Sequence, residues 1–302
     1  VMVTKSEEEH IMDEAIGNKI ADYLIKPVNP NQVLLSVKKI LGGRNLVRQQ
    51  VSSQYQQDFR SITMMLFNDL SFGEWQEVFR KLTDWELELA AGGDASMREV
   101  LQSQKAEANN AFAKSIAQSY QAWVNETDED RPLMSPDLLP QRVLPGLRQP
   151  EGEVESTFFI LVDCMRYDQW KMLEPIIAQD FAVRQDDLYC ALLPTATQYC
   201  RNALFAGLYP DEIAQNYPQF WKYDEEEGGK NLHEQDLLQE LLQRQGMQNL
   251  KWSYNKCLTA EDTRKVAEQS MALLRNDLNV LVINFLDLMG HARRDMPLLK
   301  AL

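Results

Sequence analysis

The spacing of apolar residues changes several times along this chain, which divides it into segments. Between residues 1 and 43, short apolar runs at 1–3 and 21–25 predict strands, and segments with helical periodicity at 6–16 and 31–41 predict helices. Strands that alternate with helices favour a parallel sheet covered by helices. Because about forty residues cannot complete such a sheet, we expect the missing strands to precede this stretch, which reads as part of a longer chain.

Residues 44–127 follow a single helical period instead. Breaks near 71–73 and 92–93 divide this segment into three predicted helices, rich in Gln, Glu, Arg and Leu. Aromatic residues such as Trp75 and Phe79 recur at helical spacing, which favours packing in a core over binding of a cofactor. The segment is predicted to be a helical bundle.

A proline-rich segment separates the bundle from the rest of the chain. Five prolines between Pro132 and Pro150 indicate a linker or an extended connection. After it, strands and helices alternate again. Strands are predicted at 156–163, 181–194, 250–256 and 279–287, and helices at 166–180, after 197, at 233–245 and at 260–276. This order predicts a second doubly wound α/β domain.

Composition and charge narrow the class of protein. The 302 residues carry a formal net charge of −14, which disfavours a broad nucleic-acid-binding face but leaves room for a small phosphate ester held through a metal ion. The sequence shows no apolar run of about 18 residues and no signal peptide, so we expect a cytoplasmic protein without a membrane partner. Its four cysteines are widely spaced and are expected to be reduced thiols.

Candidate chemistry lies where predicted strands end. Asp163 ends the strand at 156–163, Thr197 opens a helix after a threonine-rich turn, and Asp287 precedes His291 by one helical turn. Reactive groups of open α/β sheets gather at the carboxyl ends of the strands. Carboxylates and an imidazole there suit zinc or manganese, and a threonine hydroxyl beside such an ion could attack phosphorus.

Each of these residues also has a structural interpretation. Asp163 and Thr197 could serve as helix N-caps, for which both residue types are favoured. Asp287 and His291 could form an ordinary ion pair on one face of a helix. The occurrence of such residues at three strand ends favours the chemical interpretation.

The motifs resemble a known superfamily. "LPTATQYCRNALFAGLYP" resembles the nucleophile segment of the alkaline phosphatase superfamily, and "LVDCMRYD" and "NFLDLMGHARRDM" resemble the metal-binding segments of its PglZ branch, although three residues here separate Asp287 from His291. The resemblance implies that Thr197 is the nucleophile, a metal ligand and the carrier of a phosphothreonine intermediate. Thr195 is the rival nucleophile, because the register within "PTAT" is open.

The same resemblance implies a site with two divalent metal ions, expected to be zinc. Asp163 would bind the ion nearest the nucleophile, and Asp287 and His291 would bind the second. Arg201 and Asn202, one helical turn after Thr197, are candidate phosphate contacts, with a position on the helix surface as the equal alternative. The remaining ligands would follow residue 302, so we expect this stretch alone to bind metal weakly and to be inactive.

Residues 1–43 independently resemble the C-terminal half of a receiver domain. Thr4 matches the switch hydroxyl of that family, Tyr23 its aromatic switch and Lys26 its phosphate-contacting lysine, with magnesium as the implied ion. The order receiver (1–43), helical bundle (44–127) and PglZ domain (128–302) resembles the PorX-type response regulators associated with type IX secretion.

The resemblance implies a two-component response regulator with a metal-dependent phosphodiesterase or phosphatase as its output domain. Its expected partners are a sensor histidine kinase, a small phosphodiester or oligonucleotide substrate, a sigma factor or secretion regulator, and a second copy in a phosphorylation-dependent homodimer. The alternative is a non-catalytic regulator whose PglZ-like domain is a protein-interaction module.

Overall fold

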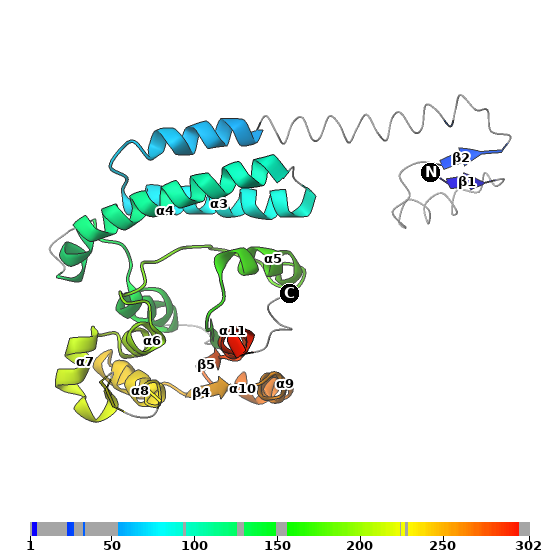
Figure 1. Ribbon diagram of the computed structural model, residues 1–302. Helices are drawn as coiled ribbons and strands as arrows, with labels where there is room; N and C mark the ends of the chain where they lie inside the picture. The colour runs from blue at the N-terminus through cyan, green and yellow to red at the C-terminus, as the bar shows by residue number, and fades with distance from the viewer. Residues whose placement is uncertain are drawn as a thin grey trace. The chain divides into compact units, whose positions relative to one another are not determined.

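The structure, a computed structural model (Figure 1), divides into two compact units, residues 1–117 and 118–302, and each is described by itself. It describes residues 2–4, 23–26, 33, 54–92, 95–125, 130–148, 156–223, 225–226 and 229–295.

The first unit contains a pair of short parallel strands, β1 (Met2–Thr4) and β2 (Tyr23–Ile25). Both predicted strands are therefore present. Thr4 ends β1 and Tyr23 begins β2, but their side chains lie outside the described residues, as do the predicted helices apart from position 33. Lys26, which follows β2, is exposed.

Three helices follow along the chain, as the sequence predicts: residues 54–65, α3 (Phe72–Gly92) and α4 (Ala95–Val124), of which α4 continues past the end of the first unit at residue 117. Glu74 accepts hydrogen bonds from the backbone N–H and the hydroxyl of Ser71, which caps α3. The helices bury one apolar cluster, made of Tyr55, Ile62, Trp75, Val78, Leu82, Leu89, Leu101 and Ala108. Phe79, expected in this core, is instead 49% exposed.

The proline-rich segment is not a linker, contrary to the sequence-based interpretation. It forms three short helices in succession, η1 (Ser135–Asp137), η2 (Leu139–Val143) and η3 (Leu144–Arg148). Its leucines explain the difference, because Leu139 and Leu144 are fully buried in the core of the second unit. Burial of these side chains stabilises a fold that the prolines alone would not predict.

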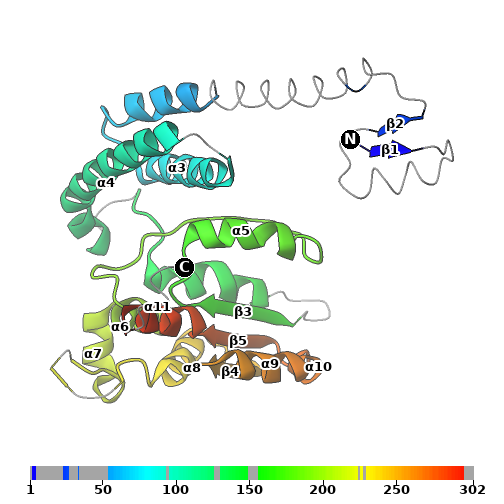
Figure 2. The same ribbon diagram turned by 45° about the vertical axis from the view of Figure 1, so that its right-hand side comes forward.

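The second unit is built on a parallel three-stranded sheet of order β3-β5-β4 (Figure 2). The strands are β3 (Thr157–Val162), β4 (Trp252–Cys257) and β5 (Leu278–Ile283). The last strand in sequence is therefore central, and all but Ile283 of its residues are buried, as a strand covered on both faces requires.

Seven helices in the described part of the chain accompany this sheet: α5 (Tyr167–Ile177), α6 (Thr197–Ala206), α7 (Pro210–Asn216), α8 (Glu234–Arg244), α9 (Ala260–Glu268), α10 (Ser270–Leu273) and α11 (Phe285–Asp295). A short turn of helix, η4 (Pro218–Phe220), follows α7. The core lies mainly between α6, α8 and the sheet, where Phe205, Leu237, Leu241 and Val280 are buried.

The predictions for residues 181–194 and 260–276 in this unit are wrong. Residues 181–194 lie outside the sheet and contribute only an isolated bridge between Cys190 and Met134, because the polar positions from Arg184 to Asp187 interrupt the apolar pattern. The helix expected at 260–276 is broken at Gln269 into α9 and α10. No helix among the described residues is long and apolar enough to cross a membrane.

Candidate functional site

The candidate site lies at the carboxyl ends of β3 and β5. Asp163 directly follows β3, and its N–H donates to the carbonyl of Ile283 at 2.9 Å, which continues the ladder one residue past the strand. On the other side of β5, the N–H of Asn284 donates to the carbonyl of Cys257 at 2.9 Å. These bonds hold the strand ends at one edge, as expected for chemistry in an open α/β sheet.

Asp287 does not end a strand, contrary to the sequence-based prediction. β5 stops at Ile283, and Asp287 lies in the first turn of α11, where a carboxylate also interacts favourably with the helix dipole. His291 follows one turn later in the same helix. Its side chain is outside the described residues, so its role as a ligand stays a prediction.

Cys164 joins the two aspartates and was not anticipated as a site residue. Its backbone is left-handed, with φ 60°, and its thiol donates to Oδ1 of Asp287 at 3.2 Å. Burial, the hydrogen bond to Asp287 and the charges of both aspartates raise the pKa of this thiol to about 11. The thiol therefore stays protonated at neutral pH and can donate.

Ligand atoms of Asp163, Cys164 and Asp287 all lie within 4.8 Å of one another. Two carboxylates and a thiolate form a donor set that zinc accepts, so Cys164 would serve as a ligand only after losing its proton to a bound ion, and the two carboxylates also suit harder divalent ions. Asp163 accepts a hydrogen bond from Arg201 through Oδ2, at 2.8 Å, so its Oδ1 can still bind a metal ion. The three described donors thus fit part of the coordination shell of a divalent metal ion.

Arg201 is buried beside this edge and binds carboxylates of the protein. The residue is 4% exposed, and Nη1 donates to Asp163 at 2.8 Å and approaches the side-chain oxygen of Asn284 at 3.3 Å. Nη2 donates to Glu234 at 2.7 Å, and Nε lies 2.6 Å from the other oxygen of Glu234. The guanidinium predicted to contact phosphate therefore orients Asp163 in this structure.

Glu234 is the centre of a charged network that sequence reasoning missed. The residue is 1% exposed and accepts hydrogen bonds from Arg201, from the Tyr254 hydroxyl at 2.7 Å and from Lys256 at 3.0 Å. Burial would lower the pKa of Arg201, but the carboxylates of Glu234 and Asp163 outweigh it and raise that pKa. Burial and the nearby Glu234 raise the pKa of the Tyr254 hydroxyl. The sequence does not reveal this role of Glu234, because acidic residues are common in the first turn of a helix such as α8.

Thr197 is the first residue of α6, and Ala196 before it is extended. Thr195 precedes the helix and is exposed. Because residues four apart share a helix face, Thr197 lies on the same side of α6 as Arg201, which contacts Asp163. The N-terminus of α6 also offers backbone N–H groups for which an anion is a suitable partner.

Asn202, the second predicted phosphate contact, is buried and binds a loop. Its amide donates to the carbonyl of Lys230 at 3.1 Å, and its side-chain oxygen accepts from Asn231 at 3.1 Å. Asn231 also donates to the carbonyl of Thr197 at 3.2 Å. Asn202 therefore helps to anchor this loop against the start of α6.

Comparison with known protein families gives two matches. Residues 45–124 match the PorX response regulator linker domain. Residues 138–297, more than half of the chain, match the BREX system PglZ alkaline phosphatase-like domain. No curated protein matches the chain.

Proposed function

The chain belongs to the PglZ family of alkaline-phosphatase-like domains and is a PorX-type regulator, and we propose a function from this premise. The proposal is that the PglZ output domain is a metal-dependent phosphodiesterase. The match to an alkaline-phosphatase-like domain supports a hydrolase of that superfamily. The ester specificity and the metal dependence are the parts that we add.

One observation carries the proposal. Asp163 and Asp287 come from distant parts of the sequence, yet with Cys164 between them their ligand atoms lie within 4.8 Å at one sheet edge. Arg201 binds Asp163 and belongs to the helix that Thr197 begins. We assign Asp163, Thr197, Asp287 and His291 as metal ligands, of which His291 rests on its sequence position.

A divalent ion bound there would supply Lewis-acid chemistry for phosphoryl transfer. The chain itself supplies the nucleophile. The Thr197 hydroxyl would give up its proton to solvent, and its oxygen would form a bond to phosphorus as the ester P–O bond breaks and the leaving oxygen takes a proton from solvent to depart as the alcohol. Water would later attack the same phosphorus and break its bond to the Thr197 oxygen, which would regain a proton as a phosphate monoester is released. The first-turn N–H groups of α6 would hold the phosphoryl oxygens. Arg201 would keep Asp163 oriented throughout.

The regulatory half of the proposal concerns the receiver segment. Thr4, Tyr23 and Lys26 would respond to phosphorylation by a sensor histidine kinase, with magnesium as the ion at the phosphorylation site. A phosphoryl group can bias a two-state element, and dimerisation is one such element. We propose type IX secretion as the regulated process and a sigma factor or secretion regulator as the downstream partner.

We predict that Thr197→Ala abolishes hydrolysis of a bis-nitrophenyl phosphate by the full-length natural protein while metal content after dialysis falls little, because the carboxylate ligands remain. Thr195→Ala is the matched control, since it removes the neighbouring exposed hydroxyl. Hydrolysis that survives Thr197→Ala and is lost in Thr195→Ala would show that the rival threonine is the nucleophile. A metal-loaded wild-type protein that hydrolyses no phosphodiester would contradict the proposal.

A further inference from the structure

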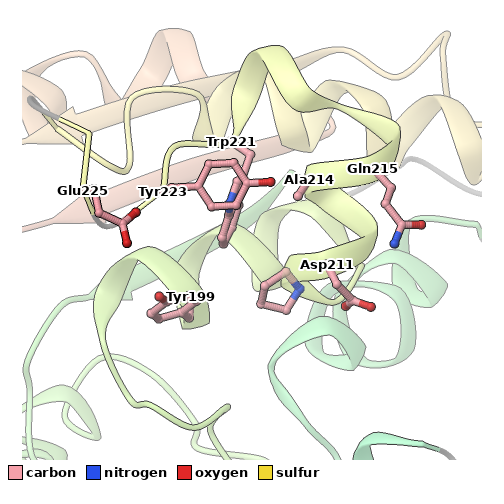
Figure 3. A pocket seen from close by; sticks show the side chains of 8 residues that line it. Tyr199, Asp211, Ala214, Gln215, Trp221, Tyr223 and Glu225 are labelled. Carbon is pink, nitrogen blue, oxygen red and sulfur yellow. The ribbon is translucent and has the colours of Figure 1, made fainter.

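A cavity lies beside α6, away from the candidate metal site. Its volume is about 440 Å³, within the range of small-molecule sites in proteins. Figure 3 shows its lining, which comes from α6, from α7 and from the segment after η4. The candidate metal site does not use any of these lining residues.

Three aromatic side chains line the cavity. The rings of Tyr199 and Trp221 have centroids 5.9 Å apart and are tilted by 48°. Trp221 is 9% exposed and held by packing, whereas Tyr223 is 60% exposed and accessible to a ligand. Faces of tryptophan and tyrosine attract cations through the ring quadrupole, and aromatic cages recognise methylated ammonium groups.

Two carboxylates accompany these rings. Asp211 and Glu225 line the cavity on different sides of the rings in the view of Figure 3, and none of the described residues that line it is a Lys, Arg or His. Within the part of the chain that the structure describes, neither carboxylate takes part in a salt bridge or side-chain hydrogen bond. The cavity therefore presents negative charge next to aromatic faces.

The cavity is distinct from the candidate catalytic face of α6. Tyr199 follows Thr197 by two positions, which turns a helix by about 200°, so the two side chains leave α6 on roughly opposite sides. A phosphate ester at Thr197 would not reach into an acidic cavity on the far side of the helix. The acidic lining would also repel an anionic substrate.

We propose that this cavity binds an organic cation with a methylated ammonium group, seated against the rings of Trp221 and Tyr223 and neutralised by Asp211 and Glu225. The proposal does not depend on the proposed phosphodiesterase activity. The PglZ domain would then have two sites: the candidate metal site and a separate site specific for organic cations.

The test is calorimetric titration of the full-length protein with choline and with its neutral carbon isostere. We expect choline to bind at least about tenfold more tightly than the isostere, because the isostere keeps the shape and loses the charge. The double variant Asp211→Asn/Glu225→Gln should lose about tenfold or more of the choline affinity. Tyr223→Leu, at an exposed position, should weaken binding by several-fold without affecting folding.

Glu240→Gln is the matched control, because it removes one carboxylate from α8, outside the cavity, and should leave choline binding unchanged. Phosphatidylcholine vesicles in a parallel titration identify the source of the cation. Vesicle binding that the double variant loses indicates a lipid headgroup, and choline binding alone indicates a free metabolite. Equal affinity for choline and its isostere, or binding of adenosine in preference to choline, would overturn the proposal.

Discussion

Arg201 is the residue on which the candidate site depends most directly. It contacts Asp163 after β3, Glu234 in α8 and Asn284 after β5, so one side chain connects three elements at the sheet edge. A buried ion pair adds little net stability compared with an apolar pair, but removal of one partner leaves an uncompensated charge. A substitution of Arg201 should therefore both displace Asp163 and lower the stability of the second unit.

We predict that Arg201→Gln lowers the free energy of unfolding by about 3–5 kcal/mol, since Glu234 then keeps a buried charge with weaker partners. Metal affinity, measured by competition with a chelator, should also fall because Asp163 loses its orienting contact. Lys256→Met is the comparison variant. Lys256 also binds Glu234 but has a 29% exposed side chain, so its loss should cost less. Urea unfolding that shows a loss under about 1 kcal/mol for Arg201→Gln would contradict this role.

The site also shows which single residues a sequence can reveal. Asp163 could be predicted because it directly follows an apolar strand, where reactive groups gather. Cys164 and Glu234 could not, because their roles depend on contacts with residues 123 and 33 positions away, respectively. The Arg201 side chain was assigned to phosphate for the same reason: its carboxylate partners are distant in sequence and close in space.

At the scale of elements, strongly patterned segments were predictable and weakly patterned ones were not. β3, β5 and α8 follow apolar periods that their own sequences display. The proline-rich segment and residues 181–194 were misassigned, because burial against the rest of the unit, and not local preference, decides their conformation. Prolines predict where a regular helix cannot continue, but not whether the neighbouring leucines are buried.

The start of α9 gives a pH-dependent prediction at this scale. The Thr259 hydroxyl accepts from the N–H of Asp262 at 3.1 Å, and Asp262 accepts from the N–H of Thr259 at 2.9 Å. Hydrogen bonds from the side chain and the backbone of Thr259 lower the pKa of Asp262 from its ordinary value of 3.8. A lowered pKa in the folded state means that the carboxylate stabilises the fold above pH 3.8 and that this contribution is lost as the pH falls through the folded-state pKa.

We therefore expect Asp262→Asn to be less stable than wild type at pH 7 and to approach wild-type stability at strongly acidic pH. Thermal unfolding of both proteins across this range measures the difference. Glu261→Gln, one position earlier on the same helix, is the control that also removes a carboxylate but not the cap. A stability difference between Asp262→Asn and wild type that stays constant on acidification would show that the cap contributes nothing through charge.

At the scale of the whole molecule, the net charge of −14 should influence how an anionic substrate arrives. Long-range repulsion slows the encounter of like-charged partners, and at physiological ionic strength salt screens this repulsion at separations beyond about 8 Å. We predict that kcat/KM for a phosphodiester rises as salt is increased from low to physiological concentration, with little change in kcat. A neutral ester measured in parallel should show no such rise. A fall in kcat/KM with salt would indicate a local basic patch that outweighs the net charge.

The strand order β3-β5-β4 has a consequence for how this unit forms during synthesis. Among the residues that the structure describes, neither β3 nor β4 has a hydrogen-bonded strand neighbour other than β5, and β5 is the last of the three to leave the ribosome. The backbone groups of β3 and β4 that pair with β5 therefore stay unpaired until β5 has been synthesised. β5 lies more than a hundred residues after β3, and loop closure over such a distance is slow. Asp163 and Asp287 meet only at that final step. A chain that ends before β5 thus cannot assemble the candidate metal site, and a ribosome-bound intermediate of this kind would expose two strands that lack their partner.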